Sequence, residues 1–253
     1  MLKDLFSLSK FNFDYHNQSR DAIHAKTKEL ISIETSKRPF RSDVINFVLQ
    51  VLNRETNYLE IGVRDPGENF DRIQATNKFS VDPGLEYKPN PVDFVMTSDD
   101  FFHGLSKGEI LNPEMRFDVI FVDGLHLAEQ VDRDIQNSLM YLSEDGFIIL
   151  HDCNPPTEYH SREDFDYKLS PAGVTWNGTT WKAFVKWRQK ADLYSCTVDT
   201  DWGVGILSKR WNIGSPSAKQ NEFFEYSKFH ADRSEALGLL NFGEFCNRLN
   251  ELK

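Results

Sequence analysis

The chain has 253 residues, of which 40% are hydrophobic and 13% aromatic, and its formal net charge is −10. This composition is enough for the core of one enzyme-sized α/β domain. The acidic balance argues against nucleic acid and anionic membrane surfaces as partners, because phosphate binding needs clustered lysine and arginine. No apolar run approaches the length of a membrane span.

The first twenty residues, MLKDLFSLSKFNFDYHNQSR, contain no continuous apolar stretch and no small-residue cleavage site, so we expect no secretion signal. The three cysteines are scattered along the chain and odd in number, which fits a reducing cytoplasm without a disulfide framework. We therefore expect a cytoplasmic protein. The sequence leaves open whether it forms a homo-oligomer.

Two helices are predicted first, over about Asp21 to Glu34 and about Ser42 to Asn53. The stretch NYLEIGVRDPG, residues 57–67, then reads as a short buried strand followed by a turn. Glu60 places a carboxylate in that strand, where it is costly unless it meets a ligand or a donor. Gly62 lets the backbone turn sharply and approach a ligand, and a helix is expected to start near Glu68.

KFSVDPG, residues 78–84, predicts a second strand that ends at Asp82. An acidic residue at that place can accept both ribose hydroxyls of an adenosine cofactor, although Asp-Pro-Gly is also an ordinary turn signal. A third strand is expected over Val92 to Met96. Ser98 or Asp99 behind it could contact an adenine edge or cap the next helix.

The clearest α/β unit spans Phe117 to His151. FDVIFVDG is a buried strand, an amphipathic helix that ends at Gly146 follows, and FIILHD is the next strand. Asp123 closes the first strand, and His151 and Asp152 close the second. Because the carboxyl ends of neighbouring parallel strands meet at one edge of a sheet, we expect these side chains to lie beside the cofactor site.

Residues 153–178 form a polar, irregular segment that is too long for an ordinary connection. A helix over about Thr180 to Gln189, two antiparallel strands and a helical last thirty residues complete the chain. The predicted fold is a Rossmann-like, doubly wound α/β domain with a seven-stranded, mostly parallel sheet, an antiparallel edge strand, and N- and C-terminal helices. It is one domain, 1–253: an N-terminal helical segment (1–54), a catalytic core (55–210) with a lid (153–178), and C-terminal helices (211–253).

Two carboxylates that converge in a partly buried site repel each other unless they are protonated or bridged by a cation. A hard divalent ion such as Mg²⁺ suits such ligands. His126 follows Asp123 by three residues, and its imidazole suits a general base near neutral pH. A position at a helix start favours the neutral ring. The simpler alternatives are that Asp123 caps the helix, His126 is an ordinary first-turn residue and His151 packs against the sheet.

EIGVRDPG resembles the first motif of class I S-adenosylmethionine-dependent methyltransferases. VDGLH and FIILHDCNPP resemble the metal-dependent sugar O-methyltransferases of macrolide and aminocoumarin biosynthesis and the related cephalosporin hydroxylase-like proteins. The resemblance implies Asp123 and Asp152 as metal ligands, with His126 as the base. His151 stands where that group has an acidic residue. We expect it as the third ligand, which favours Mn²⁺, Fe²⁺ or Zn²⁺ over Mg²⁺, and Asn154 is the alternative.

The resemblance also implies a set of residues that bind S-adenosylmethionine: Glu60, Gly62, Val63, Asp82, Ser98, Asp99 and Asp123. The expected activity is methyl transfer, assisted by a divalent metal, to a hydroxyl of a small molecule, a sugar or a glycosylated metabolite. A metal-dependent hydroxylase and a non-catalytic cofactor-binding module on the same fold are the alternatives. An N-methyltransferase fits less well, because Val-Asp-Gly-Leu replaces the Asn/Asp-Pro-Pro-Tyr motif after the fourth strand.

Overall fold

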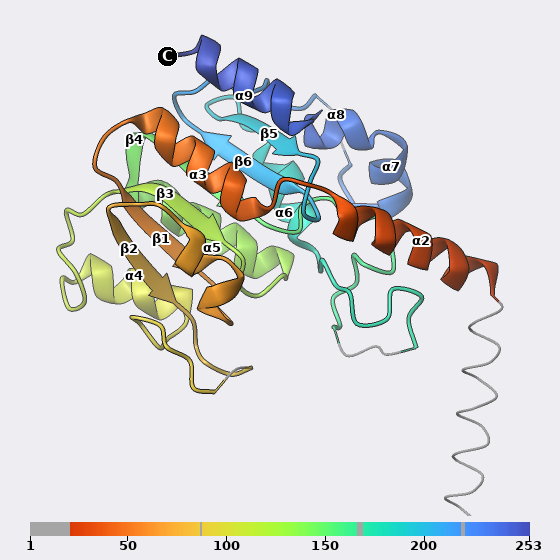
Figure 1. Cartoon of the computed structure of the whole chain (residues 1–253), viewed down its shortest axis with the longest axis horizontal. Helices are drawn as coiled ribbons and strands as arrows, with labels where there is room; N and C mark the ends of the chain where they lie inside the picture. Colours follow the sequence, from red (N-terminus) through yellow and green to blue (C-terminus); the bar gives the residue numbers. More distant parts are fainter. Residues whose placement is uncertain (1–20, 87, 166–168, 219–220) are drawn as a thin grey trace, which may run out of the picture.

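The computed structural model of the protein describes residues 21–86, 88–165, 169–218 and 221–253 (Figure 1). The first twenty residues, where we expected no secretion signal, lie outside this part. Before the sheet come helices α2 (Ala22–Ser36) and α3 (Arg41–Leu52). The remaining helices of eight residues or more are α4 (Ser98–Ser106), α5 (Ala128–Tyr141), α6 (Thr180–Trp187) and α9 (Phe242–Glu251), with the shorter α7 (Tyr226–Ala231) and α8 (Arg233–Leu237) between the last two.

A seven-stranded sheet forms the centre of the molecule, in the order β2-β1-β3-β4-β6-β5-β7. Its strands are β1 (Asn57–Ile61), β2 (Asn77–Val81), β3 (Phe117–Val122), β4 (Leu142–Leu150), β5 (Tyr194–Val198), β6 (Val204–Ser208) and β7 (Leu239–Leu240). β1 to β4 pair in parallel, and β6 runs antiparallel to both of its neighbours, β4 and β5. The predicted α/β fold class is confirmed, with the antiparallel strand β6 lying two places inside the edge of the sheet that β7 forms.

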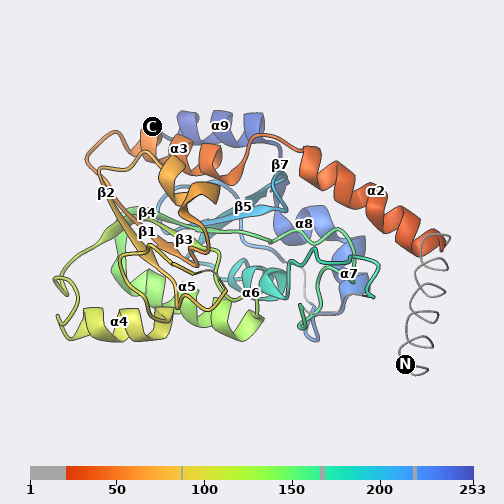
Figure 2. The same ribbon diagram turned by 60° about the horizontal axis from the view of Figure 1, so that its bottom comes forward.

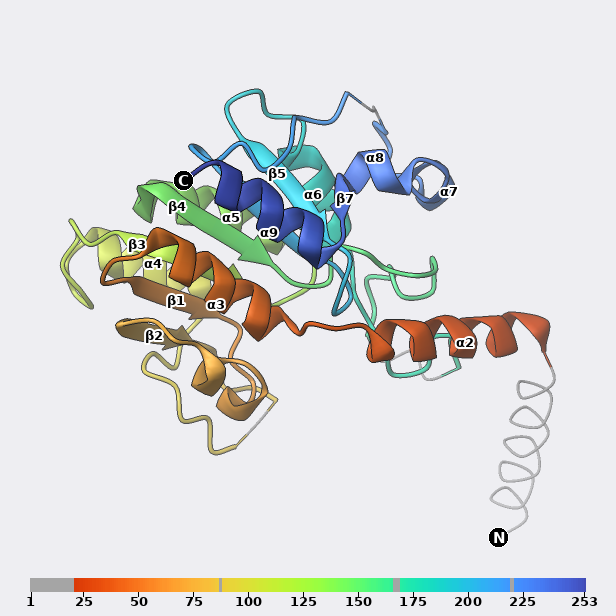
Figure 3. The same cartoon turned by 45° about the horizontal axis from the view of Figure 1, so that its top comes forward.

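Helices cover both faces of the sheet, which explains the nearly continuous apolar runs of its central strands (Figure 2). Along β3, Val119 and Phe121 face a cluster built with α3 and α9, whereas Ile120 and Val122 face a cluster built with α4, α5 and α6. All four side chains are buried. Helix α2 extends away from the sheet (Figure 3) and is tied at its end by Lys37, whose Nζ lies 2.7 Å from Asp199. No helix in the described ranges is both long and apolar enough to cross a membrane.

The strand register brings three chain segments level at one edge of the sheet. Ile61 pairs with Val122, and Val122 pairs with Leu150. The ladder then continues for one more step, since the amide of Asp123 donates to Ile61 O at 2.8 Å and that of His151 donates to Val122 O at 3.1 Å. The residues that follow the three strands therefore lie side by side, as the sequence predicted.

Three local predictions are wrong. The expected third strand over Val92 to Met96 shrinks to an isolated bridge between Phe94 and Val81. Single 3₁₀ turns, Pro66–Glu68 and Phe70–Arg72, replace the helix expected near Glu68. Gly146 lies within β4, which begins directly after α5. A side chain there would lie 2.9 Å from the carbonyl of Asp118, so close strand packing, and not a helix end, requires this glycine.

Gly62 follows β1 with a left-handed φ of 89°, and a Cβ built on it would lie 2.3 Å from the carbonyl oxygen of Asp123. We expect Gly62→Ala to lower the free energy of unfolding by about 2–4 kcal/mol, because both backbone strain and a backbone clash oppose it. Denaturant unfolding measures this. Gly67→Ala is the matched control, since its new methyl group meets only a side-chain oxygen at 3.4 Å. Equal stabilities of the two variants would contradict the prediction.

Candidate functional site

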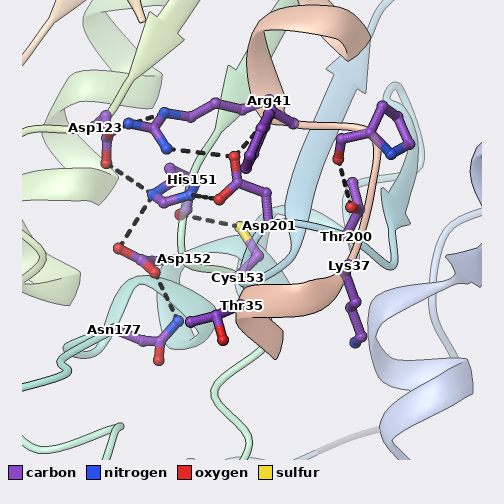
Figure 4. Close-up of polar contacts among 12 residues, drawn as sticks. Thr35, Lys37, Arg41, Asp123, His151, Asp152, Cys153, Asn177, Thr200 and Asp201 are labelled. Carbon is purple, nitrogen blue, oxygen red and sulfur yellow. Dashed lines mark hydrogen bonds and ion pairs between the residues drawn. The ribbon is translucent and has the colours of Figure 1, made fainter. Parts of the chain in front are cut away.

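Two histidines lie between two aspartates where β3 and β4 end. Asp123 Oδ1 lies 3.2 Å from Nε2 of His126 and 3.1 Å from Nδ1 of His151. Asp152 Oδ2 lies 3.2 Å from Nδ1 of His126 and 3.3 Å from Nδ1 of His151. The structure thus brings together all four residues that the sequence placed at this edge. Figure 4 shows three of them converging from two chain segments, with Asp123 after β3 and with His151 and Asp152 after β4.

The backbone at Asp152 makes this convergence possible. Asp152 has a left-handed φ of 59°, which is uncommon for residues other than glycine but tolerated best by Asn and Asp. Successive residues of an extended strand point to opposite faces of the sheet. The reversal at Asp152 lets its carboxylate approach the ring of the preceding residue, His151.

Arg41 and Asp201 complete the site, and we did not predict either of them (Figure 4). Asp201 Oδ1 lies 3.4 Å from Nε2 of His151, so this ring has a carboxylate on each side. Arg41, the first residue of α3, places its Nε 3.6 Å from Asp123 Oδ2 and its Nη1 3.3 Å from Asp201 Oδ2. The turn that carries Asp201 joins β5 to β6. The sequence predicted this pair of antiparallel strands, but it gave no other indication that Asp201 would reach the site.

The electrostatics of the cluster favour ionised carboxylates and protonated rings. Burial acts to raise the pKa of Asp123, but the charge of His151 and hydrogen bonds with both histidines hold that pKa well below its usual range. Burial acts to lower the pKa of His126, yet Asp152 and Asp123 outweigh it and raise the pKa. We expected a neutral His126 at a helix start. The ring instead precedes α5, and its surroundings are set by two carboxylates.

Asp123, His126 and Asp152 form a group that fits a divalent cation. Each offers one ligand atom, and these atoms lie within 4.8 Å of one another. Nδ1 of His126 is buried, and its 3.2 Å approach to Asp152 Oδ2 lacks hydrogen-bond geometry, so this nitrogen is left available to a cation. Carboxylate oxygens with one imidazole nitrogen suit Mg²⁺ or Mn²⁺. His151, predicted as the third ligand, lies outside this group, and the Asn154 amide donates to Asp199 instead, at 3.0 Å.

A cavity of about 500 Å³ opens beside this group. Its walls include several predicted site residues: Glu60, Gly62, Val63, Asp123, His126, His151 and Asp152. Glu60 accepts hydrogen bonds from Tyr58 Oη at 2.5 Å and Asn69 Nδ2 at 2.9 Å. Burial raises the pKa of Glu60 to about 7 despite these donors. The buried carboxylate thus has the hydrogen-bond partners that its position in a strand predicted.

The other predicted cofactor residues lie outside the walls of this cavity, as far as the described residues define them. Asp82 Oδ1 accepts hydrogen bonds from the Gly84 amide at 2.6 Å and from Asn90 Nδ2 at 2.7 Å, so it stabilises its own turn. The Ser98 hydroxyl is buried and donates to Asp134 at 2.6 Å. Asp99 is exposed and pairs with Arg133. The N-cap of α4 is Thr97, so neither Ser98 nor Asp99 has the capping role that was the alternative.

Residues 153–178 contribute one wall of the cavity through Phe165, Val174 and Trp176. The described residues of this segment form turns without a helix or a strand, as predicted. Phe165 is 65% exposed and Val174 87% exposed, unusual values for apolar side chains beside a polar cluster. The Trp176 ring stacks on that of His126, with centroids 5.2 Å apart.

The sequence profile of a family described as "Methyltransferase domain" matches residues 17–153. The match spans more than half of the chain, and the chain belongs to this methyltransferase family. The methyltransferase resemblance inferred from the strand-end motifs is therefore confirmed. No curated protein matches the sequence.

Several solved structures are similar over most of the chain. An O-methyltransferase from Bacillus cereus in complex with SAH is 14% identical, with a TM-score of 0.40 over 74% of this chain and 89% of that one. The methyltransferase MycE from the mycinamycin biosynthetic pathway, in complex with Mg, SAH and mycinamycin VI, is 12% identical, with a TM-score of 0.43 over 72% and 51%. The O-methyltransferase TomG from Streptomyces achromogenes, in complex with SAM, is 10% identical, with a TM-score of 0.41 over 78% and 95%. Likenesses this distant carry no argument about the activity of this chain.

The raised pKa of Glu60 predicts a pH-dependent stability. In the unfolded chain a glutamate ionises near its ordinary pKa of 4.5, whereas the folded protein keeps Glu60 protonated up to about 7. Its stabilising contribution is therefore full below pH 4.5 and is lost as the pH rises through 7. Relative to Glu60→Gln, we expect the free energy of unfolding of the wild type to fall by about 3 kcal/mol across this interval.

Denaturant unfolding from about pH 4 to pH 8 tests this expectation. Glu68→Gln, which removes a half-exposed carboxylate from the same loop, is the control for a change of net charge. Parallel stability curves for the wild type and Glu60→Gln would contradict the assignment.

Proposed function

We propose that the protein transfers a methyl group from S-adenosylmethionine to a hydroxyl of a small molecule, with the assistance of a divalent metal ion. The observation that carries this proposal is the convergence of Asp123, His126 and Asp152 on the cavity that also contains Glu60 and Gly62. A cofactor and an ion would thus be neighbours at the carboxyl ends of the parallel strands, the usual ligand position in open α/β sheets.

The cofactor would lie against the loop after β1. Gly62 presents backbone without a side chain, so a ligand can approach closely there, and Val63 adds an apolar wall. Glu60 would act through Asn69, whose amide it holds and which also lines the cavity. Asp82 would accept ribose hydroxyls through a rearrangement of its turn. Ser98 and Asp99 have less support, because Asp134 and Arg133 already engage them.

S-Adenosylmethionine supplies an electrophilic methyl group, and a bound divalent ion supplies a Lewis acid that lowers the pKa of a hydroxyl. The carboxylates of Asp123 and Asp152 would hold the ion, so that the ring of His126 stays free of it and Nε2 would accept the proton of that hydroxyl. Asp123 and Asp152 orient the ring, since each lies 3.2 Å from one of its nitrogens. Arg41 offsets the charge of Asp123 from the other side. Catalysis then depends on positioning and charge stabilisation.

The charges of the cavity favour an uncharged acceptor such as a sugar or a glycosylated metabolite. Six carboxylates line it: Glu60, Asp65, Glu68, Glu86, Asp123 and Asp152. Its two arginines are already paired, Arg64 with Glu68 at 2.7 Å and Arg41 with Asp201 at 3.3 Å. No arginine among the described lining residues is therefore left over to pair with a phosphorylated acceptor. The exposed faces of Phe165 and Val174 offer an apolar platform for a ring.

A metal-dependent hydroxylase is the second candidate. One carboxylate oxygen, Asp123 Oδ1, contacts nitrogens of both His126 and His151. Two histidines with one carboxylate make up a common ligand set of non-haem iron oxygenases. Formation of S-adenosylhomocysteine with an acceptor would decide for methyl transfer.

The metal prediction concerns Asp152. Asp152→Asn keeps the shape of the side chain but removes its charge, so we expect loss of metal-dependent transfer, while affinity for S-adenosylhomocysteine stays within a few-fold. An acceptor screen and titration calorimetry measure the two effects. EDTA should inactivate the wild type, and Mn²⁺ or Mg²⁺ should restore it. Full turnover by thoroughly chelated enzyme would remove the metal from the mechanism.

The base prediction concerns His126. We expect His126→Ala to lower kcat by about 10²–10⁴-fold, the usual contribution of a positioned base. Because neighbouring carboxylates raise the pKa of His126, the wild type should lose activity as the pH falls through a value above 6.5. This acidic limb should vanish in the variant. If the variant keeps most of its activity and the same pH profile, another group accepts the proton.

A further inference from the structure

The short segment from Trp176 to Thr179 contacts both His126 and Asp152. We propose that it is a positioning element that holds Asp152 as a ligand of the ion and His126 beside the ligands, so that the seating of residues 176–179 on the sheet edge and the affinity for the ion are coupled. The inference rests on the proposed metal-assisted function and adds residues to it that hold the ligands without touching the ion.

Asn177 determines which oxygen of Asp152 faces the cluster. It is fully buried, and its Nδ2 donates a 2.7 Å hydrogen bond to Asp152 Oδ1 (Figure 4). Asp152 Oδ2 is left to face His126 and His151. A carboxylate that is hydrogen-bonded on one oxygen cannot rotate freely. Asn177 therefore holds Asp152 in a single orientation.

The same segment holds His126 at its backbone and at its ring. The amide of Thr179 donates to His126 O at 2.7 Å, and Thr179 Oγ1 accepts from the Ala128 amide at 2.8 Å. The Trp176 ring lies on the imidazole at an interplanar angle of 26°. Gly178 passes so close that a Cβ there would lie 2.1 Å from His126 O.

These contacts join two parts of the chain that are distant in the sequence. His126 and Asp152 follow β3 and β4, whereas Trp176 to Thr179 lie at the end of the long segment, directly before α6. Residues that orient metal ligands typically change metal affinity by about 10–100-fold when they are removed. If residues 176–179 act in this way, weakening them should lower ion affinity without affecting the loop after β1.

The test is the affinity of Asn177→Ala for Mn²⁺, measured without any acceptor. Electron paramagnetic resonance of the free Mn²⁺ ion reports how much of it is bound. We expect about 10–100-fold weaker Mn²⁺ binding, with S-adenosylhomocysteine affinity, measured by calorimetry, within a few-fold of the wild type. Thr175→Val is the matched control. It loses the hydrogen bond from Thr175 Oγ1 to Ala172 O at 2.6 Å in the same segment but no contact to the ligands, and should bind Mn²⁺ like the wild type.

Trp176→Ala is the second variant, because its side chain is only partly buried and its loss should not prevent folding. It should also weaken Mn²⁺ binding, through His126. Wild-type affinity in either folded variant would overturn the positioning role while leaving the proposed function intact. A wild type that binds S-adenosylhomocysteine but no Mn²⁺ would instead overturn the metal part of the proposed function, and this inference with it.

Discussion

Mutual repulsion among buried carboxylates is the constraint on which the functional edge of this protein depends. Asp123, Asp152 and Asp201 come from three different strand ends and meet around one imidazole, that of His151. Such a cluster is stable only with compensating positive charge. Without an ion, Arg41 and protons on the histidines supply it, since the pKa of both His126 and His151 is raised.

An ion would have to compete with these protons. Ligands must be deprotonated to bind a metal, so a site that holds protons in its place becomes pH-dependent in its affinity. The same cluster can therefore exist in two states. With an ion bound, His126 is neutral and can act as a general base, and without one the protonated histidines pair with the carboxylates. Arg41 lies next to Oδ2 of Asp123, which leaves Oδ1 of the same carboxylate to the two histidines.

Much of the fold was predictable because its signals are local. The apolar runs around Val119 and Ile148 required strands buried on both faces, and the alternation of strands and helices required a parallel sheet, which placed Asp123 and His151 side by side. The errors came from marginal elements. Val92 to Met96 carries a strand pattern, but it makes one bridge only, and Gly146 resembles a helix end although strand packing requires it.

The site was only partly predictable because its remaining members depend on tertiary contacts. Nothing near Arg41 marks it as a partner of Asp123, which is far away in the sequence. Asp201 lies in a hairpin turn whose place was predictable but whose side-chain direction was not. Asn177 belongs to a segment without regular structure, so no periodicity relates it to Asp152. Such residues need the fold before they can be recognised.

The contact between Gly62 and the Asp123–Gly124 backbone limits how this edge of the sheet can change in evolution. Main chain meets main chain there, with no side chain between them. The spacing between the loop after β1 and the loop after β3 is therefore fixed by peptide geometry, and substitutions in the surrounding core cannot alter it gradually. Lining side chains can diversify toward new ligands, while the distance between the two halves of the cavity stays constant.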